Sequence, residues 1–420
     1  MLARLLFVCM LLFSTGCSNQ SIINGAKVES INEASSTELV VVWHTYGDEE
    51  TRVFENQLLP MFEKEYPHIK IKAVRQAYND QLLNTLITRA SAKQPPDVVR
   101  MDMVWVPQFA DLNLLYPISK FSDFNQYSKK FYTQAMETNK YQGEYYGLPL
   151  NLNTKVAIYN SQQLKKAGLT KPPRTMEEFL AVVKENDYVI GLRNSSAWNS
   201  LSYFVGFGGQ LTNPQYTKSS GYLNSPGSIQ AVQTMLELFK NGNIDAHFLN
   251  EPIDQWNGVL QGQYFMIDEG PWFYSILLND KQKSSLIHKN TVAAPFPVNE
   301  NKGSVIGGEN LVIMKGTRHL QAAWTFIKWM SQTEVQEVMF RTGLIPTNKE
   351  AAHSYDQLDQ PFIEPYVKGL EQAYLRPPVD NWSKIEKIYR DYLEKILAEE
   401  MGVEEGLNKA AKEIDPLLKE

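Results

Sequence analysis

Residues 39–101 decide the fold class, and they read LVVVWHTYGDEETRVFENQLLPMFEKEYPHIKIKAVRQAYNDQLLNTLITRASAKQPPDVVRM. Short runs of β-branched or alternating apolar residues predict three strands, at 39–43, 68–74 and 97–101. Apolar residues at helical spacing predict two helices between them, over 49–66 and 78–92. Strands that alternate with helices indicate βαβ units and a mainly parallel α/β sheet, with the strand at 39–43 buried on both faces.

Further elements follow toward the carboxyl end. Thr175–Glu178 and Ser331–Glu334 both have the capping-box pattern, which predicts that a helix begins at each. Apolar runs predict strands at 265–267 and 305–314 and helices over 227–241 and 320–330. We place Trp324 and Trp329 in the core, because they lie on a regular amphipathic helix.

The first seventeen residues predict the compartment. An apolar run at 5–13 follows the positive charge of Arg4, and the small residues Ser14–Gly16 precede Cys17. The run is shorter than the roughly 20 apolar residues of a membrane span, so residues 1–16 read as a signal peptide. Cys17 resembles the acylated cysteine of a bacterial lipobox, and an ordinary secretory signal is the alternative. The polar residues 17–38 then form a flexible tether to an extracytoplasmic domain.

Composition narrows the function classes. The chain has 420 residues and a formal net charge of −6, and it lacks a basic block that could follow phosphates, so nucleic-acid binding is disfavoured. The only cysteines are Cys9 and Cys17, so we expect no disulfide in the mature domain. The six histidines are scattered, and the motifs of metalloproteases, P-loop enzymes and serine hydrolases are missing. We therefore expect no metal, no cofactor and no enzymatic activity.

Seven phrases, in order, resemble a known family. They are ADLNLLYP at 110–117, YYGLPL at 145–150 continued by NLNTKVAIYN at 151–160, KKAG at 165–168, PPRTMEEF at 172–179, MIDEGPW at 266–272, Gly307–Gly308, and RTGLIP at 341–346. Together they are similar to the family 1 extracellular solute-binding proteins, the carbohydrate-binding components of ABC importers. The resemblance runs from about Leu39 to the end of the chain.

The resemblance implies a periplasmic-binding-protein-like α/β fold of two lobes, joined by crossing strands, with a ligand cleft between them. Lobe one would comprise residues 39–150 and 303–349, and lobe two residues 151–302 and 350–420. The implied function is capture of a carbohydrate, a di- or oligosaccharide, and its delivery to the membrane subunits of an ABC permease. We expect a monomer that Cys17 anchors to a bacterial membrane.

A sugar site combines hydrogen-bonding side chains with flat aromatic platforms. Carboxylates are strong acceptors for hydroxyl groups. Candidate ligand contacts of these kinds follow predicted strands or lie in polar loops: Trp43, Tyr46, Asp48, Glu49, Asp102, Asn151, Trp198, Asn199, Trp256, Glu269, Trp272, Gly308, Glu309 and Arg376. By resemblance, Trp272 is the preferred stacking platform. The alternatives are core packing for Trp43, helix capping for Asp48 or Glu49, and a surface salt bridge for Arg376.

Three other functions remain open. The same fold could bind a polyamine or an organophosphate, and the cleft loops, which offer mostly aromatic and acidic residues, suit a polyamine better than an anion. A secreted polysaccharide-degrading lipoprotein would need paired carboxylates such as Asp268–Glu269. That pair is a poor acid–nucleophile couple, because adjacent residues of a strand point to opposite faces. A sensory lipoprotein is the third alternative.

Overall fold

The computed structural model describes residues 37–251, 253–299, 303–353 and 362–418. Residues 37–420 form one compact unit. The predicted signal peptide, Cys17 and nearly all of the predicted tether lie outside the described residues. The last tether residue, Glu38, begins the first strand.

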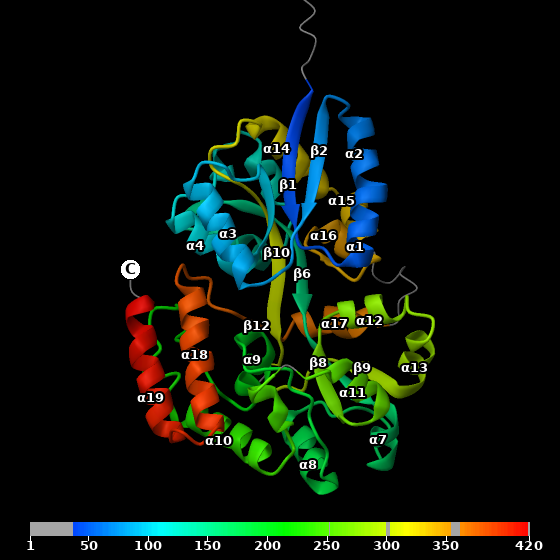
Figure 1. The fold of residues 1–420 in the computed structure, drawn as a ribbon, viewed down its shortest axis with the longest axis vertical. Helices are drawn as coiled ribbons and strands as arrows, with labels where there is room; N and C mark the ends of the chain where they lie inside the picture. The colour runs from blue at the N-terminus through cyan, green and yellow to red at the C-terminus, as the bar shows by residue number, and fades with distance from the viewer. Residues whose placement is uncertain (1–36, 252, 300–302, 354–361, 419–420) are drawn as a thin grey trace, which may run out of the picture. The chain divides into compact units, whose positions relative to one another are not determined.

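Seven of the described strands form a mixed sheet in the order β11-β6-β10-β3-β1-β2, and β12 pairs with β10 (Figure 1). They are β1 (Glu38–His44), β2 (Ile69–Arg75), β3 (Val98–Asp102), β6 (Gly147–Thr154), β10 (Val305–Ile313), β11 (Ile345–Pro346) and β12 (Tyr374–Leu375). The prediction of a mainly parallel sheet holds for β2, β1 and β3 and for the short pair of β10 with β12. It is wrong at β10, which runs antiparallel to both β3 and β6, because β10 brings the chain back into this sheet from the opposite end.

Short helices and a small hairpin surround this sheet. They are α1 (Asp48–Val53), η1 (Phe54–Leu58), α2 (Leu59–Glu65), α3 (Asp80–Ser91), η2 (Met103–Trp105), α4 (Val106–Asp111), η3 (Ile118–Lys120), α5 (Phe124–Ser128), α6 (Thr133–Glu137), β4 (Lys140–Tyr141), β5 (Glu144–Tyr145), α14 (Leu320–Met330), α15 (Thr333–Phe340) and α16 (Lys349–Ala352). Trp324 and Trp329 are each 2% exposed, which confirms that they belong to the core.

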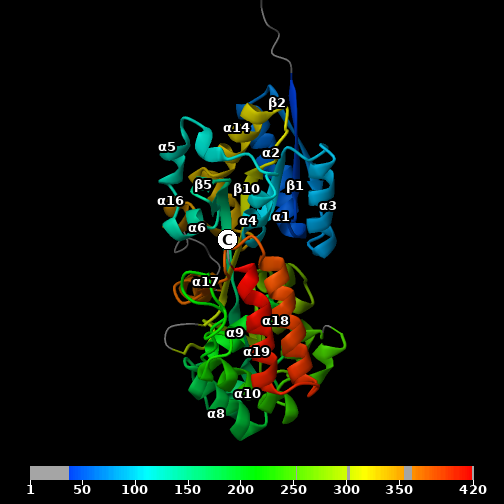
Figure 2. The same ribbon diagram turned by 90° about the vertical axis from the view of Figure 1, so that its left-hand side faces the viewer.

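A second group of elements surrounds a three-stranded antiparallel sheet of order β8-β7-β9. This group comprises β7 (Val156–Asn160), α7 (Ser161–Lys166), α8 (Met176–Asn186), α9 (Ala197–Gly206), α10 (Pro226–Lys240), η4 (Ala246–Leu249), α11 (Gln255–Gln261), β8 (Met266–Glu269), α12 (Trp272–Leu277), α13 (Lys283–Asn290), β9 (Thr291–Ala294), α17 (Ile363–Leu370), α18 (Trp382–Leu397), α19 (Val403–Ile414) and η6 (Asp415–Leu417). Helices α18 and α19 lie side by side along it (Figures 1 and 2).

The strands β6 and β10 run from the first group of elements to the second (Figure 1). They pair with each other along most of their length, from Gly147–Val312 to Thr154–Ile306. Only Lys155 separates the end of β6 from the start of β7, so the same extended segment enters both sheets. Asp102, at the carboxyl end of β3, pairs with Glu309 of β10, and Glu309 pairs with Asn151 of β6. The end of β3 therefore lies close to the point where β6 leads into β7.

Strand β1 is not buried on both faces as its sequence predicts. Val40 and Val42 are 0% and 1% exposed, whereas Leu39, on the other face, is 49% exposed. Helix α14 covers the first face. On the second face, Trp43 is half-buried and packs against the core cluster that includes Leu82 and Leu86 of α3. The apolar run therefore predicts the strand correctly and its burial incorrectly.

The helix predicted over 49–66 contains a turn that the sequence pattern did not predict. Its middle, η1, is π-helical, and the Leu59 N–H group donates to the Phe54 carbonyl five residues back. Pro60 follows immediately, and it has no N–H group and crowds the carbonyl four residues before it. The wider π turn makes room for this proline without ending the helix.

Of the two predicted capping boxes, only the first forms. The Thr175 hydroxyl accepts from the Glu178 N–H group at 3.1 Å, and the Glu178 carboxylate accepts in return from the Thr175 N–H group at 3.3 Å. The prediction for Ser331 is wrong, because its hydroxyl donates to the Ile327 carbonyl at 2.7 Å, and α15 begins after Gln332. The preceding helix thus competes successfully for the serine side chain.

Replacing Thr175 by alanine is therefore expected to lower the free energy of unfolding by about 1 kcal/mol, because α8 loses its cap. The matched control is Gln332→Ala at the N-cap of α15, whose side chain makes no capping hydrogen bond, and it should change the free energy of unfolding by no more than about 0.5 kcal/mol. Equilibrium denaturation of both variants measures the difference. Equal losses would mean that the Thr175 cap contributes nothing of its own.

Candidate functional site

A buried polar cluster forms where β3, β6 and β10 lie next to one another. The Arg100 guanidinium forms an ion pair with Glu309 at 2.8 Å and donates to the Thr45 hydroxyl at 2.8 Å and to the Asn151 amide oxygen at 3.2 Å. Asn151 and Asn153 both donate to the Glu309 carboxylate, at 2.6 and 3.3 Å. We call these five residues the Arg100 cluster. It supplies amides and a carboxylate among the interior strands of the larger sheet.

Tyr46 and Gly308 complete this region. The Arg100 guanidinium lies 4.5 Å from the centre of the Tyr46 ring. Burial raises the pKa of the Glu309 carboxyl, although the charge of Arg100 opposes that rise. Gly308 has a φ of +149°, and a Cβ there would lie 2.4 Å from the Asn151 carbonyl oxygen. Gly308 is therefore required by the close approach of β10 to β6.

Asp102 is the last residue of β3, and its carboxylate joins that strand to Arg376, which follows β12. Its carboxylate accepts from the Tyr78 hydroxyl at 2.6 Å and from the Val104 N–H group at 3.0 Å. The Arg376 guanidinium lies 3.5 Å from Asp102 Oδ1, the oxygen that also accepts from Val104. It lies 5.2 Å from the centre of the Trp198 ring. Asp102, Arg376 and Trp198 are thus brought together, and Arg376 is buried and not part of a surface salt bridge.

Two tryptophans from the second group of elements lie close together at this junction. The ring centres of Trp198 and Trp272 are 6.2 Å apart, and the ring planes are inclined by 34°. Both rings are half-buried. A Cβ on Gly307 would lie 2.7 Å from the Trp198 ring, so strand β10 passes directly against that ring. Tilted, partly exposed indoles of this kind offer apolar faces with N–H groups at their edges.

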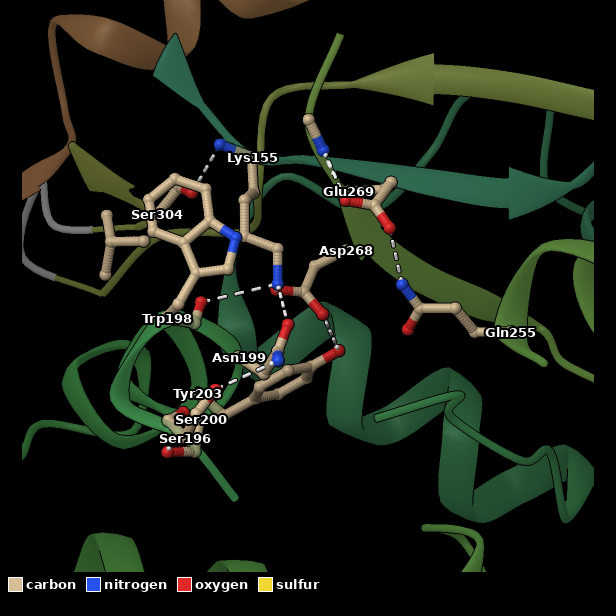
Figure 3. Close-up of polar contacts among 12 residues, drawn as sticks. Lys155, Ser196, Trp198, Asn199, Ser200, Tyr203, Gln255, Asp268, Glu269 and Ser304 are labelled. Carbon is tan, nitrogen blue, oxygen red and sulfur yellow. Dashed lines mark hydrogen bonds and ion pairs between the residues drawn. The ribbon is translucent and has the colours of Figure 1, made fainter. Parts of the chain in front are cut away.

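Lys155 forms a second buried polar group below the indole of Trp198 (Figure 3). Its side chain is 0% exposed, and its ammonium forms an ion pair with Asp268 at 2.5 Å and donates to the Asn199 amide oxygen at 2.9 Å. The Tyr203 hydroxyl donates to the second Asp268 oxygen at 3.2 Å. Burial raises the pKa of the Asp268 carboxyl, although Lys155 opposes that rise. We call these four residues the Lys155 cluster.

Comparison with known proteins identifies the family. The family model described as "Bacterial extracellular solute-binding protein" matches residues 57–361, most of the chain. The chain belongs to this family.

Individual relatives fit the same assignment. This solute-binding protein is 26% identical over 353 residues to the maltotriose-binding protein of Pyrococcus abyssi, covering 80% of this chain and 73% of that protein. It is 24% identical over 434 residues to an uncharacterised ABC transporter extracellular-binding protein of Pyrococcus horikoshii, covering 98% of this chain and 95% of the other. Both the family resemblance and the family model therefore point to the same class of protein.

The solved structures confirm the two-lobed α/β fold. The GacH receptor of Streptomyces glaucescens, which was solved without ligand and in complex with acarbose, superposes with a TM-score of 0.79 at 22% identity. The match covers 91% of this chain and 98% of that receptor. We predict that the elements around the larger sheet form one lobe and those around the smaller sheet the other.

Glu269 and Trp256 of this solute-binding protein lie beside Trp272. The Glu269 carboxylate accepts from the Trp256 indole N–H group at 2.7 Å and from the Trp272 indole N–H group at 2.8 Å. Asp268 and Glu269 thus point to opposite faces of β8, as their adjacent positions predict. The prediction that Trp198 and Asn199 lie in a polar loop is wrong, because both belong to the first turn of α9. Asn199 accepts from Lys155, and its amide donates to Asn194, which precedes the helix, at 2.7 Å.

Three predicted contacts lie apart from these clusters. Asp48 is exposed and forms an ion pair with Arg75 at 2.7 Å, and Glu49 forms one with Arg52 at the first turn of α1. Acidic residues there interact favourably with the helix dipole, which is a sufficient structural role. Trp43 packs half-buried, with a guanidinium 5.3 Å from its ring centre.

The sequence reasoning missed Tyr78, Arg100, Lys155 and Asn153. Arg100 has the clearest sequence signal, since a charged residue inside an otherwise apolar strand needs a buried partner. Within the described ranges, no cluster of histidines, cysteines and carboxylates is able to hold a metal ion. No helix in the described part of the chain is long and apolar enough to cross a membrane.

Proposed function

We propose that this protein is the extracytoplasmic substrate-binding component of an ABC importer and that it binds a carbohydrate, a di- or oligosaccharide, between its lobes. The observation that carries the proposal is the pairing of the Trp198 and Trp272 rings beside Asp102 and Arg376. Flat apolar faces next to carboxylate and guanidinium groups match the C–H faces and hydroxyls of a sugar ring. The ligands named for its relatives, maltotriose and acarbose, support the same class.

The charges at the junction favour a neutral ligand over the alternatives. Each buried cation there already has a carboxylate partner: Arg100 pairs with Glu309, Arg376 with Asp102, and Lys155 with Asp268. An organophosphate would have to compete with these carboxylates for the cations. A polyamine would have to compete with these cations for Glu309, Asp102 and Asp268. Hydroxyl groups can bond to both members of such pairs without separating them.

The proposal extends to the parts of the chain outside these clusters. Residues 1–16 act as the signal peptide, acylated Cys17 anchors the protein to a bacterial membrane, and residues 17–36 are the tether, since Glu38 already belongs to β1. Residues 39–150 and 303–349 form one lobe, and residues 151–302 and 350–420 the other. Ligand that contacts both lobes shifts the population toward a closed monomer, which the permease recognises. No catalytic step is part of the proposal.

The direct test is a titration of the purified protein with mono-, di- and trisaccharides, followed by tryptophan fluorescence. We expect a dissociation constant on the order of 1 μM, about −8 kcal/mol, for at least one sugar. sn-Glycerol 3-phosphate and spermidine serve as the organophosphate and polyamine arms. A response to either of these with silence across all the sugars would overturn the carbohydrate assignment.

Replacing Trp272 by alanine should weaken sugar binding about 10- to 100-fold, since burial of one large aromatic surface contributes about 1.5–3 kcal/mol. Calorimetric titration with the best sugar measures the loss. Trp43→Phe is the control, because Trp43 packs outside the clusters and its change should leave the affinity unaltered. A comparable loss at Trp43 would contradict the placement of the platform.

A further inference from the structure

Glu269 binds four donors of its own chain. Trp256 Nε1 and Gln255 Nε2 both donate to Glu269 Oε2 at 2.7 Å. Trp272 Nε1 and the Gly270 N–H group donate to Oε1 at 2.8 and 2.9 Å. Glu269 is 3% exposed and is the last residue of strand β8. Figure 3 shows its bond to Gln255. We call these five residues the Glu269 cluster.

The four donors use the full hydrogen-bonding capacity of this carboxylate. A carboxylate offers about four acceptor sites, and each Glu269 oxygen already accepts two hydrogen bonds. Burial of an ionised carboxylate is unfavourable unless its bonds replace those to water. Among the ion pairs of the described residues, none includes Glu269, so neutral donors alone provide that compensation. No acceptor position remains for a ligand hydroxyl, which argues against a direct ligand contact.

The Trp272 indole is fixed at both of its ends. Its N–H edge is bonded to Glu269, and its six-membered ring lies against Gly270, where a Cβ would come within 2.2 Å of Trp272 Cη2. The Gly270 peptide is itself held, because the Tyr366 hydroxyl donates to its carbonyl at 2.9 Å. The ring therefore has one orientation in which both the bond to Glu269 and the contact with Gly270 are kept. In that orientation it faces Trp198.

We propose that Glu269 is a positioning residue that holds the indoles of Trp256 and Trp272 and thereby sets the orientation of the platform at Trp272. As far as it concerns ligand affinity, this inference rests on the proposed function. Glu269 acts through the rings and does not touch the sugar. Its charge is the acceptor that two indole N–H groups share.

The first test measures the indole N–H resonances of the purified full-length protein by ¹H–¹⁵N NMR, without ligand. In Glu269→Gln, an NH₂ group, which cannot accept a hydrogen bond, replaces one of the two oxygens that accept from the indole N–H groups. The Trp256 and Trp272 resonances should move upfield and exchange faster with solvent. Trp324 and Trp329, whose indoles donate to Asp123 and Glu65 at 2.8 and 2.9 Å, provide unchanged internal references. Trp256→Phe and Trp272→Phe assign the signals, each by the loss of one resonance.

The second test measures maltotriose affinity by calorimetry. Glu269→Gln should bind maltotriose about tenfold more weakly, as expected for loss of a charge-assisted bond. Asp123→Asn is the control, because the Asp123 carboxylate also accepts from an indole, that of Trp324, but lies outside the site clusters, is part-buried and is paired with Lys328. It should leave the affinity unchanged. Gly270→Ala displaces the ring with the carboxylate intact, so it should also weaken binding. The effects of Gly270→Ala and Glu269→Gln should be less than additive, since both act through Trp272.

The outcomes separate this inference from the proposed function. Unchanged Trp272 resonances in Glu269→Gln overturn it, and weaker binding with unchanged resonances assigns Glu269 a direct ligand contact instead. If the Trp256 and Trp272 resonances shift in Glu269→Gln but the maltotriose affinity is unaltered, the orientation of the Trp272 ring does not determine affinity and that part of the inference is overturned. Should the unmodified protein bind no sugar, the proposed function fails. The resonances alone then decide whether Glu269 positions the rings.

Discussion

Replacing Lys155 by methionine is expected to lower the free energy of unfolding by about 3–5 kcal/mol. The ammonium and the Asp268 carboxylate are both buried, at 0% exposure, and 2.5 Å apart. Methionine fills most of the volume of lysine but leaves the carboxylate without a charge partner and the Asn199 amide oxygen without a donor. Guanidinium denaturation at pH 7.5 measures the loss.

The pH dependence of that loss provides a second check. Burial already raises the pKa of the Asp268 carboxyl, and removal of Lys155 removes the charge that opposes this rise. The variant should therefore bind a proton at Asp268 in the folded state at a pH where the unfolded carboxyl, with a pKa of about 3.9, is ionised. Its destabilisation is complete above the folded pKa and shrinks as the pH falls toward the unfolded value. We expect a smaller loss at pH 5 than at pH 7.5.

A double variant controls for the loss of packing. Lys155→Met with Asp268→Asn removes both charges, and the remaining amide can still accept from Tyr203. It should recover most of the stability, because a buried ion pair contributes little compared with one isolated buried charge. If the double variant is as unstable as Lys155→Met alone, packing and not charge accounts for the effect.

Replacing Gly308 by alanine should destabilise the protein by about 2–6 kcal/mol, the sum of about 1–3 for backbone strain and about 1–3 for overpacking. The φ of +149° is unfavourable for any residue with a Cβ, and the new methyl group would meet the backbone carbonyl of Asn151 at 2.4 Å. Neither obstacle is removed by a side-chain rotation. Thermal and denaturant unfolding measure the loss.

Gly307→Ala is the matched control for Gly308→Ala. Its Cβ would approach the Trp198 side chain at 2.7 Å and no backbone atom within 3.4 Å, and its φ is not positive. We expect a stability loss of about 1–3 kcal/mol, together with weaker sugar binding because the ring is displaced. An equal loss of stability in the two variants would contradict the importance of the Gly308 backbone conformation.

Local sequence patterns predicted the elements well because those patterns act over a few residues. The strands at 39–43, 68–74 and 97–101 form β1, β2 and β3, and the Thr175 capping box begins α8. Strand direction was not predictable in this way. The direction of β10 depends on where the chain re-enters the sheet after lobe two, which no local pattern encodes. The Ser331 error has the same origin, since a preceding helix competed for the hydroxyl.

The candidate site was predictable where a polar residue lies within a strand or at its end. Asp102, Asn151 and Glu309 lie on β3, β6 and β10, and they meet at the junction. Lys155 was missed because its carboxylate partner is 113 positions away in the sequence. Asp48 and Glu49 also follow a strand, but they turn toward solvent with α1. The contacts of the candidates with a sugar remain a prediction.

Because two indoles share one carboxylate, a mutation that changes ligand specificity at one indole also affects the bonds of the other. Substitution of Trp272 by a residue without a donor leaves a buried acceptor at Glu269 with three donors instead of four. A new specificity at position 272 is therefore expected to require a second change at position 269, whereas Trp256 and Gln255 constrain what that change can be. The four positions should show strong epistasis in a mutational scan, whereas Trp198, which has no such acceptor among its described bonds, should couple to position 272 by ring contact and not to position 269.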